Sequence, residues 1–151
     1  MNCSGHTLNP EEVLVTILDK NDKRDHTEEV RALFLEAGWI APEDDPAFIA
    51  PMLRNSFCIA GAFYEGKLIG MMRALSDGVS DAYLLDMVVL KKYRKNGIAL
   101  RILDCLTGYL KTLGIDWMLC ISVPEAESLY LKRGHRMEGH IPIRFDQEAA
   151  K

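Results

Sequence analysis

A cluster of cations is the first feature of this sequence that could do chemistry. No acid lies between Met87 and Leu103, a stretch that holds Lys91, Lys92, Arg94, Lys95 and Arg101. The chain as a whole carries a formal net charge of −4, so this local excess stands out. The cations surround the point, near Asn96 or Gly97, where an amphipathic helix is predicted to begin. Positive side chains are unfavourable at that end of a helix unless an anion lies between them.

The predicted helix start also lacks the usual caps. No Ser, Thr or Asp stands at its start and no acid occupies its first turn, so its first N–H groups have no partner within the helix. A bound phosphate would satisfy these amides, and Gly97 would let the backbone approach it closely. The alternative is a solvated basic loop before a frayed helix. The basic run, missing cap, glycine and preceding apolar strand together favour the phosphate site.

Asp86 is the second candidate, because it lies inside an otherwise apolar run, "AYLLDMVVL". A carboxylate in a central strand is costly unless it is paired or functional. Asp86 is either a general base, acting directly or through water, or a structural acceptor for backbone amides. The sequence leaves both interpretations open.

Strands alternating with helices must position these residues. Strands are predicted over residues 11–18, twice within 56–78 around a turn at "EGK", over 82–90 and over 116–123, with at most two short ones in 135–145. Helices are predicted over 26–38, with Thr27 as N-cap and Gly38 closing the helix, and in a short stretch capped by Asp45 with Pro46 in its first turn. Two more are predicted over 97–114 and within 122–134, the latter with Ser122 and Glu125 at capping-box spacing. The order β-α-α-β-β-β-α-β-α-β predicts a mixed α/β domain.

Length and composition narrow the class of protein. A chain of 151 residues predicts a single domain over 1–151, with residues 1–10 as a flexible lead-in. The sequence pI near 5.6 argues against nucleic acid as a partner. No signal peptide and no run of ~20 apolar residues is evident, which predicts a cytoplasmic protein without a membrane partner. The cysteines Cys3, Cys58, Cys105 and Cys120 form no C-x-x-C pair, so we expect reduced thiols and no metal site.

The basic run also carries a motif. Residues 94–99 read R-x-x-G-x-A, whereas neither a P-loop nor a dinucleotide fingerprint is present. This motif resembles the acetyl-CoA signature of the GNAT superfamily of N-acetyltransferases, and "ESLYLKRGH" resembles that family's "lYeklGF" ending. By element order the resemblance runs from Glu11 to the C-terminus, and it is most specific over residues 83–135. It implies a GNAT-like mixed sheet of about six or seven strands flanked by about four helices, with strands splayed at the cofactor cleft.

The resemblance implies an N-acetyltransferase that uses acetyl-CoA and no metal, and acts by direct attack of a primary amine of a small molecule or peptide. The pyrophosphate would lie on backbone amides of Arg94, Lys95, Asn96, Gly97, Ile98 and Ala99. The pantetheine arm would lie along Met87, Val88 and Val89, with an amide near Val88 facing the thioester. Tyr130 matches the family's tyrosine and would be the acid for the leaving thiolate. Residue type alone would favour simple packing for Tyr130.

Some positions depart from the family's pattern. Val123 replaces an asparagine that commonly supports the cofactor, which keeps open a non-catalytic acyl-CoA-binding module. His135 replaces the phenylalanine of the ending. The short tail predicts either an abbreviated last hairpin or one completed by the partner subunit of a homodimer. The acids at 43–45 border the expected acceptor cleft, and capping of the next helix is favoured over attraction of a cationic amine.

Overall fold

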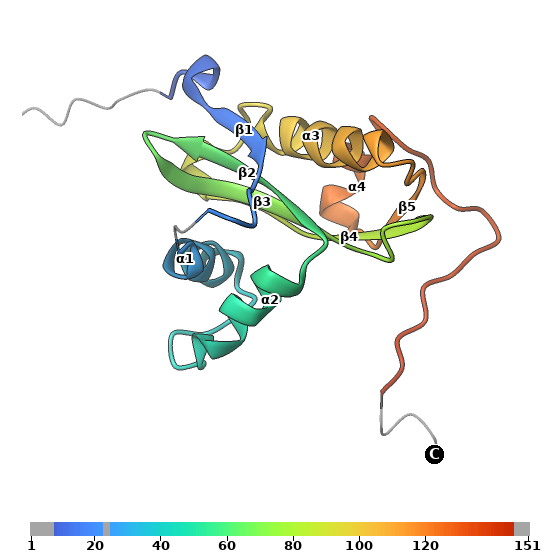
Figure 1. Cartoon of the computed structure of the whole chain (residues 1–151), viewed down its shortest axis with the longest axis horizontal. Coiled ribbons are helices and arrows are strands. Elements are labelled where there is room, and N and C mark those ends of the chain that lie inside the picture. The colour runs from blue at the N-terminus through green and yellow to red at the C-terminus, as the bar shows by residue number, and fades with distance from the viewer. Residues whose placement is uncertain (1–7, 23–24, 147–151) are drawn as a thin grey trace, which may run out of the picture. The chain divides into compact units, whose positions relative to one another are not determined.

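The computed structural model describes residues 8–22 and 25–146 (Figure 1). The chain divides into two compact units, the first ending at Cys120 and the second beginning at Ile121. The first holds β1 (Leu14–Ile17), α1 (Thr27–Ala37), α2 (Ile49–Asn55), β2 (Cys58–Tyr64), β3 (Lys67–Ser76), β4 (Asp81–Val89), α3 (Ile98–Thr112) and β5 (Trp117–Cys120). The second holds α4 (Glu127–Tyr130). The predicted lead-in and Cys3 lie largely outside the described residues, although Asn9 caps a 3-10 helix over Pro10–Glu12.

The sheet is mixed, which confirms the predicted fold class. Its order is β1-β2-β3-β4-β5, antiparallel as far as β4 and parallel between β4 and β5. The predicted hairpin at "EGK" is present, since β2 and β3 are joined through Glu65 and Gly66, both at positive φ. That conformation matches the twist of the flanking strands in a tight hairpin.

The predicted count of six or seven strands is too high, because the sheet has five strands over the residues that the structure describes. The difference lies in the tail, where residues 135–146 form no strand. Ile141, Ile143 and Phe145 alternate as a strand would, yet they are 80%, 66% and 92% exposed. Pro142 removes a backbone donor from this segment. Alternation alone makes no strand without a hydrogen-bonding neighbour and a surface to bury.

Helices cover both faces of the sheet within the first unit (Figure 1). One face packs against α1 and α2, where Val30, Leu33 and Ile49 join Met71 and Val88 in one buried cluster. The other face packs against α3, which buries residues four apart: Ile98, Ile102, Leu106 and Leu110. This spacing keeps one helical stripe on the sheet. Tyr109 and Leu113, although apolar residues of the same helix region, are exposed.

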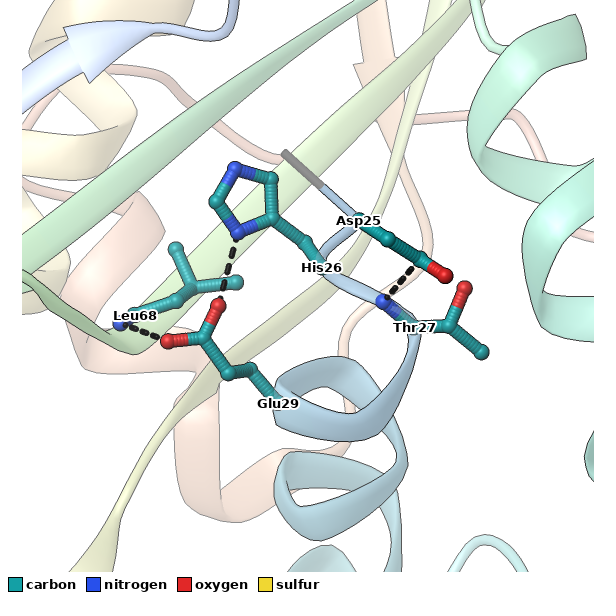
Figure 2. Close-up of polar contacts among 5 residues, drawn as sticks. All are labelled: Asp25, His26, Thr27, Glu29 and Leu68. Atoms are coloured by element: carbon teal, nitrogen blue, oxygen red, sulfur yellow. Dashed lines mark hydrogen bonds and ion pairs between the residues drawn. The ribbon is translucent and has the colours of Figure 1, made fainter. Parts of the chain in front are cut away.

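Two carboxylates of α1 accept hydrogen bonds from backbone N–H groups, one of β3 and one of the loop after β4. Glu29 Oε1 accepts the backbone N–H of Leu68 at 2.9 Å, and its Oε2 lies 2.7 Å from His26 Nδ1 (Figure 2). Seven residues further along the same helix, Glu36 accepts the N–H of Lys91. A charged acceptor makes the stronger class of hydrogen bond. The helix is thus fastened to the start of β3 and to the loop after β4.

Of the predicted helix caps, the one at Gly38 is present, whereas those at Thr27 and Ser122 are absent. Gly38 ends α1 in the left-handed conformation as predicted, at φ 73°. Thr27 is not the N-cap of α1: the helix begins at Thr27, and the Asp25 carboxylate accepts its N–H at 2.9 Å (Figure 2). The predicted capping box at Ser122 is also absent, since the Ser122 hydroxyl donates to the Val123 carbonyl at 2.8 Å.

Candidate functional site

A β-bulge interrupts β4 at the candidate Asp86. Met71 pairs with Val88 and Arg73 with Leu85, so Asp86 and Met87 together oppose the single residue Met72. Asp86 has φ 58°, in the left-handed region. A bulge of this kind bends its strand, increases the local twist and disrupts the ladder of hydrogen bonds. β4 therefore contains a bulge, and Asp86 is its first residue.

The second edge of β4 becomes free at the same place. The parallel pairing with β5 runs from Asp81 opposite Trp117 to Leu84 opposite Cys120 and stops there. Beyond it, β4 residues 85–89 have no strand partner on that side among the residues that the structure describes. Met87, Val88 and Val89, the predicted pantetheine contacts, lie on this stretch. Apart from the Val89 carbonyl, which accepts from Arg94 Nε, this strand edge is open to an extended ligand that would pair in the manner of an added strand.

The loop from β4 to α3 is held rigidly by side chains bonded to backbone carbonyls. Arg94 Nε donates to the carbonyl of Val89 at 2.8 Å. Asn96 Nδ2 donates to the carbonyls of Tyr93 at 3.1 Å and Arg94 at 3.0 Å. With the Glu36 contact to Lys91, these bonds leave the loop little freedom. The side chains of Arg94 and Asn96, two of the predicted cofactor residues, thus shape the loop themselves.

The start of α3 is uncapped by any side chain, as predicted. Gly97 is its N-cap at φ 72° and ψ 5°, with no side-chain cap bond and no acid in the first turn. Lys95 also has a positive φ, 63°. Left-handed residues next to a helix start turn consecutive N–H groups toward one point, which makes an anion-binding concavity. A Cβ built on Gly97 would meet no atom within 4 Å, so the space beside these amides is open.

The five cations do different work. Arg101 donates to the carbonyls of Pro10 at 2.8 Å and Val13 at 2.6 Å, and so fastens the N-terminal segment to α3. A hydrogen bond to Tyr93, and more weakly the charges of Glu36 and Glu65, raise the pKa of Lys92, which lies over the Tyr93 ring at 4.6 Å. Lys91 and Lys95 are exposed. Some of these cations therefore stabilise the fold and others remain exposed, a difference that their spacing along the chain could not show.

Asp86 has an ionic partner that the sequence analysis missed. Arg73 Nε lies 2.5 Å from Asp86 Oδ2, and the side chains are only 13% and 24% exposed, respectively. Arg73 Nη1 donates to Ser56 Oγ at 3.4 Å. The signal was present in the sequence, because Arg73 is a lone cation inside the apolar strand "LIGMMRAL". A charge in such a strand requires a partner for the same reason that Asp86 does.

The second unit carries Tyr130, the predicted acid. Tyr130 is the last residue of α4, and its side chain is half-buried. Its carbonyl accepts the N–H groups of Arg133 and Gly134, each at 2.9 Å, which closes the turn after the helix. Val123, at the usual asparagine position, precedes the 3-10 helix Pro124–Ala126 and is 61% exposed. It makes no side-chain cap bond.

The acidic loop after α1 favours the capping interpretation. The N–H of Ala41 donates to Asp44 at 2.7 Å, and that of Ala47 donates to Asp45 at 2.9 Å. Asp45 and Pro46 begin a 3-10 helix as predicted. Trp39 and Phe48 both pack on the Phe34 ring, with centroids 5.2 and 6.5 Å away. Asp44 and Asp45 are thus used locally.

Residues 8–22 and 25–146 carry no features of a metal site or a membrane-spanning helix. No group of three or more His, Cys, Asp or Glu side chains there is arranged to hold a metal ion. No helix in the same ranges has the length and apolarity to cross a membrane. Cys58, Cys105 and Cys120 are free thiols. Burial raises the pKa of Cys58 to about 11, so this thiol is not a nucleophile near neutral pH.

Comparison with known proteins gives one family and one fold. A sequence model of the Acetyltransferase (GNAT) family matches residues 22–135. A probable acetyltransferase from Staphylococcus aureus is 24% identical with TM-score 0.68, over 87% of this chain and 100% of that one. A GNAT-family acetyltransferase from Streptococcus pneumoniae is 18% identical with TM-score 0.70, over 90% and 99%. Aminoglycoside N-acetyltransferase AAC(6')-Iy, solved with CoA, is 16% identical with TM-score 0.67, over 89% and 95%. No curated protein matches the chain.

Proposed function

The chain belongs to the acetyltransferase (GNAT) family, and we propose that it transfers the acetyl group of acetyl-CoA to a primary amine of a small molecule or peptide. The observation that carries this proposal is the uncapped start of α3, with Gly97 at φ 72°, one loop after a bulged strand with a free edge. The family match spans residues of both units, which supports one acetyltransferase domain.

The residues at this site fit acetyl-CoA. The backbone amides around Gly97 would hold the pyrophosphate, since phosphate is the ligand that a helix N-terminus prefers. Lys91 and Lys95, exposed on the same loop, add positive charge for a polyanion. The free edge of Met87, Val88 and Val89 would pair with the amide-containing pantetheine arm. Ile98 and Ala99 contribute first-turn amides of α3.

The groups of this chain would then promote a single acyl transfer from the thioester to the amine. Bound acetyl-CoA supplies an acyl group on a thioester, and the amine nitrogen forms the C–N bond as the C–S bond breaks. The Val88 amide would donate to the carbonyl oxygen. The amine must lose one proton and the departing sulfur must gain one. Tyr130, with a phenolic O–H, is the candidate donor to sulfur.

The acceptor amine is the least constrained part. Aminoglycoside acetyltransferases are among the structures that share this fold, at 16% to 20% identity. The same fold supports many substrates, because acceptor contacts come from loops. Asp44 and Asp45 are bonded within their own loop, so they argue little for a cationic acceptor. A broad panel of amines is therefore the appropriate test.

A two-stage experiment tests the proposal. Acetyl-CoA should raise the melting temperature of the protein, whereas acetate should not, because the phosphates bind the α3 amides. CoA release should then be measured across amines, polyamines, amino acids, aminoglycosides and peptides, with a no-amine control for hydrolysis.

The alternative is a non-catalytic acyl-CoA-binding module on the same fold. Val123 favours it, since the asparagine that commonly supports the cofactor is missing there. Stabilisation by acetyl-CoA without CoA release from any amine would select this alternative. If acetyl-CoA gives no stabilisation and no amine releases CoA, both functions are refuted.

A further inference from the structure

We propose that Arg73 is a positioning residue of this site. Its guanidinium, backed by Ser56, holds Asp86 in the left-handed conformation that makes the β4 bulge, and Asp86 is an ionic anchor instead of the base. The catalytic consequences of this inference rest on the proposed function. The structural core of it, a coupled Arg73–Asp86 pair, does not.

The backbone at Asp86 needs an external hold. Glycine adopts a φ near 58° freely, whereas for other residues it is uncommon, with Asp and Asn among the more tolerant. Asp86 adds to that conformation a 2.5 Å contact with Arg73, across the hairpin on β3. A left-handed aspartate persists when its surroundings determine it. The ion pair is the contact that does so here.

Arg73 is itself held from behind. Its Nη1 donates to Ser56 Oγ at 3.4 Å, and the Ser56 hydroxyl donates to the Met52 carbonyl at 2.8 Å. Ser56 is 1% exposed and is the C-cap of α2. The next residue, Phe57, donates its N–H to Ala74 on β3 at 2.8 Å. A chain of polar contacts therefore runs from the end of α2 across β3 to the bulge.

The bulge decides which β4 side chains face the helices. Cross-strand partners share a face, so Leu85 lies on the face of Arg73 and Val88 on the face of Met71. One residue, Met72, lies between the partners on β3, but two, Asp86 and Met87, lie between them on β4. The extra residue puts Val88 into the cluster under α1, and loss of the bulge would turn it to the other face. Arg73 thus fixes the direction of the strand that would hold the thioester.

The same pair makes Asp86 a poor base. To take a proton from an amine, its carboxylate would give up the ion pair and leave the shielded charge of Arg73 without a partner. The bulge would lose its hold during the step that needs it. We therefore assign the amine proton to water at the site, and the Asp86 carboxylate keeps its contact with Arg73.

A mutant cycle tests this assignment. Arg73→Met, Asp86→Asn and the double variant should be compared with Arg73→Lys and Ser56→Ala, by melting temperature, acetyl-CoA Kd, and kcat and KM against pH. We expect Arg73→Met and Asp86→Asn each to lower kcat/KM roughly 10- to 100-fold, because the thioester would be misplaced relative to the amine. Each should also raise the acetyl-CoA Kd. The double variant should be no worse than the poorer single one, because both remove the same contact. Arg73→Lys and Ser56→Ala should lose less.

The pH profile and a matched control separate anchor from base. Asp86→Asn should keep the acid limb of the wild-type profile. Arg144→Met with Asp146→Asn is the control, an Arg–Asp pair that is 88% and 49% exposed, and it should change neither stability nor rate. Loss of the acid limb in Asp86→Asn, with Arg73→Met still active, would make Asp86 the base and overturn the inference.

Failure of the proposed function would be seen separately. If the wild-type protein acetylates no amine, melting temperatures of the unliganded variants still form a complete cycle. Additive losses for Arg73→Met and Asp86→Asn would refute the anchor whatever the activity. Coupled losses would support the anchor in a protein with another role.

Discussion

Replacing Gly97 by alanine separates the phosphate site from helix stability. Gly97 and Gly114 flank α3, at φ 72° and 80°. A Cβ at either position meets no atom within 4 Å, so the cost of alanine at both is conformational and not steric. Gly114→Ala is therefore a matched control at the other end of the same helix.

The stability loss can be worked from these angles. A left-handed L-residue costs roughly 1–2 kcal/mol, and alanine recovers about 0.4–1 kcal/mol by restricting the unfolded chain. The net is about 1 kcal/mol for each variant. In a chain of this size that corresponds to a fall of about 2–4 °C in melting temperature. Both variants should show this fall in the absence of ligand.

Only Gly97→Ala should weaken binding of acetyl-CoA. Its new methyl group enters the open space beside the uncapped amides, where the pyrophosphate is proposed to lie. We expect at least tenfold weaker binding, about 1.4 kcal/mol, by titration calorimetry well below the melting temperature. Gly114→Ala should bind as the wild type does. Equal affinities for all three proteins, or equal losses in both variants, would contradict the placement of the phosphates at α3.

Three further predictions concern Asp77, Cys58 and the loop before α3. Hydrogen bonds from the backbone amides of Ser80 and Val79 lower the pKa of Asp77 to about 2 from 3.8. Its stabilisation is complete above the unfolded value and is lost as pH falls through the folded value near 2, so Asp77→Ala should melt earlier than wild type at pH 6 and by a smaller margin at pH 2. A constant difference at both pH values would contradict this. Cys58, buried with its pKa raised to about 11, should be alkylated at pH 8 only after unfolding in urea, as mass spectrometry would show; rapid native labelling would argue against it. Arg94→Met should lower both the melting temperature and the acetyl-CoA affinity, because Arg94 holds the Val89 carbonyl. Lys95→Met should lower the affinity alone, and most at low salt. Equal melting temperatures of Arg94→Met and the wild type would exclude a structural role for Arg94.

Local features of the sequence were enough to predict the family and the mixed sheet, and they are the basis of the proposed anion site. The uncapped start at Gly97, the left-handed turn at Gly38 and the hairpin at Glu65 and Gly66 depend on residues within a few positions of one another. Such features follow from backbone sterics and from hydrogen bonds that a helix end cannot make for itself. The apolar spacing of α3 likewise reports its buried face directly.

Contacts between distant residues were decided only by the tertiary structure. Arg73 meets Asp86 across a hairpin, Glu36 reaches Lys91 over 55 positions, and Arg101 reaches Pro10 over 91. Which buried charge pairs with which depends on strand register, and register depends on a bulge that no local pattern announces. The predicted last strand failed for the same reason, since a strand exists only where a neighbour pairs with it. The sequence by itself predicted an anion site beside a half-buried carboxylate. Only the folded chain showed that the carboxylate already has a partner.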